Sequence, residues 1–102
     1  MKFEIWQLPI SHPNKFMRSE WCKENIQIRD YVMVYSGEIK SDTEDINEFL
    51  EELFYIFNNE HPADYHAASM SVSDIVCLIG KCNKRFWFYV DGEGFKEVEA
   101  NV

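Results

Sequence analysis

Histidine and carboxylate residues gather between His61 and Asp74, and these residue types could bind a metal ion or transfer protons. The segment holds His61, Asp64, His66 and Asp74. Imidazole and carboxylate groups are common metal ligands, and a folded loop could bring the two histidines together. However, their spacing matches no known metal-binding motif. We therefore expect no metal and no cofactor, and we expect the two aspartates to accept hydrogen bonds from backbone N–H groups in turns.

Cysteines offer a second kind of chemistry. The chain has Cys22, Cys77 and Cys82, an odd number at no spacing typical of a disulfide framework. Cys77 and Cys82 lack the second pair of ligands that would complete a zinc site. Neither has a neighbouring histidine in the sequence that could activate its thiolate. We expect core or surface cysteines in a reducing cytoplasm, and a protein that is not an enzyme.

Basic and aromatic residues lie together near the C-terminus. Lys81, Lys84 and Arg85 precede the aromatic run Phe86 to Tyr89. Proteins that bind single strands stack bases on exposed aromatic rings beside cations, so Lys81, Lys84, Arg85 and Trp87 form a candidate RNA or single-stranded DNA site. Alternating aromatic residues on a strand are also normal in a sheet core, and three cations give a weak electrostatic signal. Direct nucleic-acid binding is therefore the alternative rather than the main hypothesis.

An amphipathic helix is predicted from Thr43 to Asn58, and the rest of the chain is organised around it. Ser41 with Glu44 would form a capping box, and Pro62 blocks continuation. One face is apolar, with residues spaced as in a helix of 3.6 residues per turn: Ile46, Phe49, Leu50, Leu53, Phe54 and Phe57. The other face is acidic and carries Glu44, Glu48, Glu51 and Glu52.

The net charge of −8 is concentrated around this helix, because no Lys or Arg occurs between Lys40 and Lys81. This charge disfavours nucleic-acid binding through the region, since phosphate binding needs cations. A basic partner protein is compatible with it. The candidate partner-binding residues are Asp42, Glu44, Asp45, Glu48, Glu51 and Glu52. The competing interpretation is a solvated face with no partner, which is the usual role of a charge run.

The remaining segments predict one α+β domain over residues 1–102, a mostly antiparallel sheet packed against one long acidic amphipathic helix in the order β-α-β-α-β-β-β. A helix after Pro13 would bury Phe16, Met17, Trp21 and Cys22. The strand from Gln27 to Ser36 has apolar residues on both faces, which is typical of a central strand. Further strands are predicted at Lys2–Ile10, Ile75–Ile79, Arg85–Val90 and Phe95–Val98. No signal peptide or membrane span is recognisable, so we expect a cytoplasmic protein.

Several motifs resemble those of YodL-like domains, in the same order and over about Gln7 to Val98. They are Tyr31–Val34–Tyr35 with Gly37, Leu53–Phe54 with Phe57–Asn58, HPADY from His61, SMSVSD from Ser69, and YVDGEGFKEV from Tyr89. The SxSVSD run followed by YVDxxGFKEV is fairly specific as a pair. Ala67 and Ala68 depart from the pattern, since the family usually has Gly and a polar residue there.

This resemblance implies an accessory module of phages, plasmids and conjugative elements. Such domains generally occur within larger proteins, whereas this chain is a single acidic domain, and it resembles small anti-defence proteins such as anti-CRISPR proteins. The implied function is inhibition of a type II RNA-guided nuclease complex in the host cytoplasm, with the acidic residues replacing nucleic-acid phosphates. The resemblance transfers no catalytic role to any residue, and the oligomeric state stays open.

Overall fold

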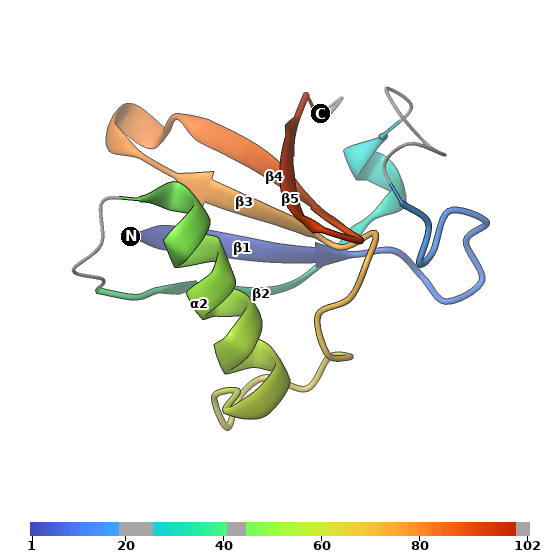
Figure 1. Cartoon of the computed structure of the whole chain (residues 1–102), viewed down its shortest axis with the longest axis horizontal. Coiled ribbons are helices and arrows are strands. Elements are labelled where there is room, and N and C mark those ends of the chain that lie inside the picture. Colours follow the sequence, from blue (N-terminus) through green and yellow to red (C-terminus); the bar gives the residue numbers. More distant parts are fainter. Residues whose placement is uncertain (19–25, 41–44, 100–102) are drawn as a thin grey trace.

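The computed structural model describes residues 1–18, 26–40 and 45–99. It is an α+β fold with a five-stranded antiparallel sheet in the order β2-β1-β3-β4-β5 (Figure 1). The strands are β1 (Lys2–Gln7), β2 (Val32–Glu38), β3 (Ile75–Ile79), β4 (Arg85–Asp91) and β5 (Gly94–Val98). The described residues also form the α-helix α2 (Ile46–Asn59) and two 3-10 helices, η1 (Ile28–Asp30) and η2 (Lys81–Asn83).

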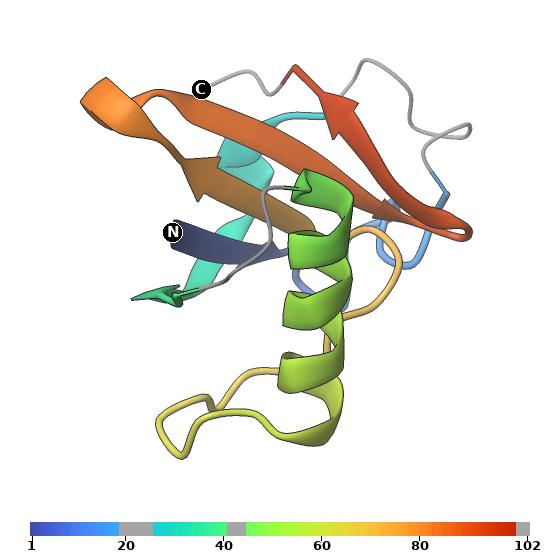
Figure 2. The ribbon, with the colours of Figure 1, turned by 60° about the vertical axis from the view of Figure 1, so that its left-hand side comes forward.

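The sheet has an apolar layer on each face. On one face α2 buries Phe49, Leu50, Leu53 and Phe57 against strand residues such as Phe3. On the opposite face η1 and its neighbours cover a second cluster, so that α2 and η1 lie on opposite sides of the sheet (Figure 2). The second cluster contains Leu8, Ile26, Ile28, Tyr31, Ile75, Cys77, Trp87 and Tyr89. Alternation along β4 supplies both layers, because successive strand side chains point to opposite faces.

The helix is confirmed, but it begins later than the sequence predicts. Asp45 is its N-cap, and the Asp45 carboxylate accepts hydrogen bonds from the N–H groups of Asn47 (2.8 Å) and Glu48 (3.4 Å). An aspartate in this position satisfies N–H groups that lack a partner within the helix. Ser41 and Glu44, the predicted capping box, lie outside the described residues.

The helix predicted after Pro13 is absent from the described part of that segment, where residues 10–16 form turns. Phe16 has a φ of +68°, which no right-handed helix permits. Its N–H donates to the Ser73 hydroxyl over 2.9 Å, and the Tyr89 hydroxyl donates to the Met17 carbonyl over 2.5 Å. Backbone groups that a helix would use internally therefore bond to distant residues. Trp21 and Cys22 lie outside the described residues.

The prediction of a central strand from Gln27 to Ser36 is wrong, because β2 is an edge strand and begins only at Val32. The apolar residues that suggested two buried faces belong to different structures. Ile28 lies in η1 and packs in the second cluster with Tyr31, whereas Val32 and Met33 are 57% and 44% exposed. A local pattern cannot distinguish these environments, because both place apolar residues close together in the sequence.

Candidate functional site

The histidines and aspartates of the loop after α2 do not form a site. His61, Asp64 and His66 are exposed, whereas Asp74 is completely buried. Asp64 accepts a hydrogen bond from the Tyr35 hydroxyl over 3.0 Å. Partial burial of the tyrosine and this aspartate raise the pKa of Tyr35. Among the described residues, no group of three or more His, Cys, Asp or Glu side chains could hold a metal ion.

Asp74 is the centre of a buried polar network. Its Oδ2 atom accepts hydrogen bonds from the Ser71 N–H (2.9 Å) and Gln7 Nε2 (3.1 Å), and its Oδ1 atom lies 3.5 Å from Lys15 Nζ. Gln7 also donates to the Ala68 carbonyl over 2.9 Å. Burial raises the pKa of Asp74 to about 6, although the Ser71 N–H, Lys15 and Gln7 all favour the charged form. Among the described residues, Asp74 Oδ1 accepts no hydrogen bond and is partnered through the ion pair with Lys15. The other bonds link β1 to the loop after α2, so the network holds distant segments together.

The two motif halves that identify the family resemblance are joined by backbone hydrogen bonds. The Ser73 N–H donates to the Val90 carbonyl over 3.0 Å, and the Val90 N–H donates to the Asp74 carbonyl over 2.9 Å. The Ser73 carbonyl in turn accepts from the Tyr31 hydroxyl over 2.7 Å. The expectation that the two aspartates accept hydrogen bonds from backbone N–H groups is confirmed for Asp74 through its Oδ2 atom. Asp64 instead accepts from the Tyr35 hydroxyl, and Ser73 Oγ accepts from the distant Phe16 N–H. The SMSVSD motif therefore has a structural role in this chain.

The two described cysteines match the expected core and surface positions. Cys77 is buried, and burial raises the pKa of its thiol, which disfavours the nucleophilic thiolate. Cys82 is exposed in the β3–β4 turn. Cys22 lies outside the described residues.

The candidate nucleic-acid residues lie on β4 and in the turn that precedes it. Trp87 is only 8% exposed, and its ring packs against Trp6 with centroids 5.9 Å apart. Arg85 Nη1 donates to Glu4 Oε1 over 2.6 Å, and this hydrogen bond raises the pKa of the guanidinium. Lys84 Nζ lies 5.2 Å from the centroid of the Phe86 ring. Lys81 and Lys84 are exposed, but the candidate nucleic-acid site lacks an exposed aromatic ring at Trp87.

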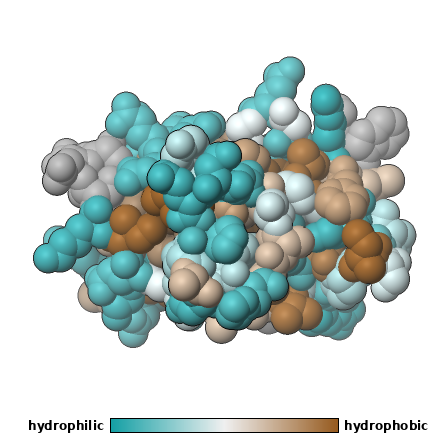
Figure 3. Space-filling model, turned by 90° about the horizontal axis from the view of Figure 1, so that it is seen from below, coloured by the Kyte–Doolittle hydropathy of each residue, from teal (hydrophilic) through white to brown (hydrophobic). Residues whose placement is uncertain are grey.

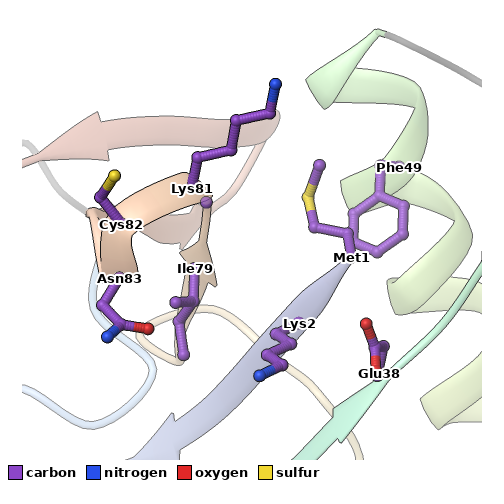
Figure 4. Close-up of a pocket in the computed structure, with 9 residues that line it drawn as sticks. Met1, Lys2, Glu38, Phe49, Ile79, Lys81, Cys82 and Asn83 are labelled. Carbon is purple, nitrogen blue, oxygen red and sulfur yellow. The ribbon is translucent and has the colours of Figure 1, made fainter.

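An open pocket of about 510 Å³ lies between the first turns of α2 and the β3–β4 turn. Lys2 and Lys81 line it, yet their amines point in different directions (Figure 4). Glu38 and Asn83 also supply polar atoms, and Phe49 and Ile79 supply apolar surface. Because the polar groups do not converge on one point, the pocket offers no arrangement for catalysis or for holding an anion.

The exposed acidic side of α2 is the strongest candidate surface. We define the acidic surface as Asp45, Glu48, Glu51 and Glu52, all of which are exposed. The helix contains no basic residue, and its opposite side is anchored in the core. Asp42 and Glu44 belong to the same predicted set but lie outside the described residues. The helix therefore presents several carboxylates on a rigid element.

The side of the molecule seen from below in Figure 1 is also mostly polar. Hydrophilic side chains cover most of that side, with small separate hydrophobic patches between them (Figure 3). No helix in the described part of the chain is long and apolar enough to cross a membrane. Polar contacts would thus dominate an interaction on that side.

Sequence reasoning missed the residues that surround Asp74. Gln7 and Lys15 come from the N-terminal segment, and their bonds to Asp74 join residues far apart in the sequence. Nothing in the local sequence around either residue indicates a buried partner. Lys15 is only 7% exposed in its side chain, an unusual environment for a lysine.

Comparison with known protein families gives one match: the model described as "YodL-like domain" matches residues 2–100. No curated protein and no solved structure matches the chain. The family match covers nearly the whole sequence, including both halves of the motif that the structure joins.

Proposed function

This chain belongs to the YodL-like domain family, and on that premise we propose that it is a non-enzymatic inhibitor of a host defence protein. Its partner is a basic surface of a type II CRISPR effector or its guide complex in the cytoplasm of the host bacterial cell. The acidic surface of α2 makes the contact, together with Asp42 and Glu44. The resemblance to modules of mobile elements supports this choice of partner, because such elements meet host defences.

The acidic surface itself carries the proposal. Glu48 and Glu52 are four residues apart on α2, and Glu48 and Glu51 are three apart, so like charges are neighbours. Such pairs destabilise a helix by roughly 0.2–0.5 kcal/mol each. A helix optimised for stability alone would alternate acidic and basic residues. Several exposed carboxylates on a well-anchored helix that has no basic residue therefore support a role in binding cations.

The mechanism follows from the chemistry of the partner. An RNA-guided nuclease holds its heteroduplex in a positively charged channel, mainly through the nucleic-acid backbone. A helix with carboxylates along one side can occupy Lys and Arg side chains that would otherwise contact phosphates. Phe49, Leu50, Leu53 and Phe57 bury the other side of α2, so the helix backbone that carries the carboxylates needs little ordering on binding. Inhibition requires no covalent step.

The test is a pull-down from cells that carry a type II system, with tagged wild type and a Glu48→Lys, Glu51→Lys, Glu52→Lys variant. We expect wild type to recover the effector and inhibit target cleavage, and the variant to do neither. A matched control reverses the same number of charges elsewhere: Glu93→Lys, Glu97→Lys and Glu99→Lys, all exposed in or beside β5. The control should retain binding. Circular dichroism checks that both variants are folded.

The outcomes separate the proposed interface from its alternatives. Equal recovery by wild type and the α2 variant would show that the effector is bound elsewhere. In that case a Lys81→Ala, Lys84→Ala variant tests the β3–β4 turn, with electrophoretic mobility shift on guide RNA and single-stranded DNA as the readout. Failure of wild type to recover any effector component would reject the proposed partner.

A further inference from the structure

We propose that the outer edge of β2 is a second binding site, which takes an extended basic segment of a partner protein as an additional strand. This site is distinct from the acidic surface, and the proposal does not depend on the identity of the defence target.

β2 has an available edge. It is the first strand in the sheet order, and among the described residues only β1 pairs with it. The outer backbone N–H and C=O groups of an edge strand can pair with another chain. Val32 and Met33 on this strand are 57% and 44% exposed, so an added strand would also cover apolar surface. Recognition of this kind draws affinity from backbone hydrogen bonds and selectivity from side-chain contacts.

The other edge of the sheet is protected in a way that β2 is not. β5 carries exposed Lys96 and Glu97 near its centre, and charged residues discourage strand addition. Residues 32–37 of β2 include no acidic or basic residue, and Glu38 stands at the end of the strand. Charged residues therefore discourage strand addition at the β5 edge, whereas the β2 edge lacks this protection over residues 32–37.

Acidic groups beside β2 select a basic occupant. The C-terminal end of α2 and the following loop extend beyond β2 in both ribbon views (Figures 1 and 2). The loop is linked to the strand through Tyr35 and Asp64, and Glu60 is exposed at the end of the helix. These carboxylates favour lysine or arginine on an added strand.

A second copy of the chain fits this edge less well. Antiparallel pairing of two β2 strands places a two-fold axis perpendicular to the sheet, so both copies of α2 lie on the same face. Each copy brings its acidic surface and the acidic loop to that face. Like charges would oppose the pair, whereas a basic extended segment gains from the same groups.

The experiment uses a fluorescent peptide of about nine alternating lysine and valine residues, a length that covers one edge strand. Fluorescence anisotropy measures its affinity for the full chain, and amide NMR shifts locate it. We expect saturable binding with the largest shifts in Val32–Glu38 and none in β5. A peptide N-methylated at alternate residues, which keeps its side chains but loses backbone donors, should bind at least about tenfold more weakly.

Variants distinguish strand addition from charge attraction. Met33→Lys should weaken binding by about tenfold, because a lysine on the edge disfavours pairing. Tyr55→Lys is the matched control, since it converts another exposed residue, 56% exposed on α2, with the same charge change. Equal losses in the two variants, shifts confined to α2, equal binding of the N-methylated peptide, or no binding would overturn the proposal. So would self-association through β2, detected by analytical ultracentrifugation, that excludes the peptide.

Discussion

At the scale of single residues, Asp74 shows how a polar motif can have a structural role. Its carboxylate joins β1 through Gln7, the N-terminal turns through Lys15 and its own loop through Ser71. Replacing any one partner would leave a buried polar group unsatisfied, which costs about 1–3 kcal/mol. These contacts give the motif residues a structural role.

The raised pKa of Asp74 predicts a specific pH dependence of stability. The folded state retains the Asp74 proton up to a pH of about 6, whereas the unfolded state releases it near 3.8. The contribution of this group to the free energy of unfolding is largest below the lower value. It falls by roughly 3 kcal/mol as the pH rises through this interval and is constant above it.

Asp74→Asn is the variant that checks this prediction. Urea denaturation between pH 4 and 7 measures the free energy of unfolding of wild type and variant. The value for wild type minus that for the variant should decrease as the pH rises, by on the order of 3 kcal/mol. A difference that is independent of pH would contradict the raised pKa. Asp64→Asn is the control, because it makes the same substitution at an exposed aspartate.

At the scale of elements, α2 is fixed by its N-cap and its buried side. Asp45→Ala removes the acceptor for the N–H groups of Asn47 and Glu48 and should lower the free energy of unfolding by about 1 kcal/mol. Chemical denaturation measures this change. Glu51→Ala, an exposed change within the helix, should alter stability by less than about 0.5 kcal/mol. Equal changes in the free energy of unfolding for the two variants would show that the N-cap hydrogen bonds of Asp45 contribute nothing beyond its charge.

At the scale of the whole molecule, the net charge of −8 predicts opposite effects of salt on the free protein and on its complex. Screening reduces repulsion within the acidic protein and should raise its melting temperature as NaCl increases from about 20 to 500 mM. The same screening should weaken binding to a basic partner. Calorimetry of the free chain and a salt titration of the complex measure the two effects. A complex that strengthens with salt would contradict an electrostatic interface.

Much of the fold could be predicted because its signals are local. The apolar run of β3, the aromatic run of β4 and the helical periodicity of α2 each depend on residues within one short segment. The acidic side of the helix is also a local property, and the structure leaves Glu48, Glu51 and Glu52 exposed as that pattern indicates. The family resemblance depended on motifs read in order along the chain, and the family match covers residues 2–100.

The sequence by itself therefore determined the strands of the C-terminal half, the amphipathic helix and the location of the excess negative charge. Only the tertiary structure decided that residues 10–16 form turns, that β2 is an edge strand, that Trp87 is buried and that Gln7 and Lys15 surround Asp74. The physical reason is that burial, strand neighbours and long-range hydrogen bonds depend on which distant segments meet. Local periodicity records which residues share a face, but not what covers that face.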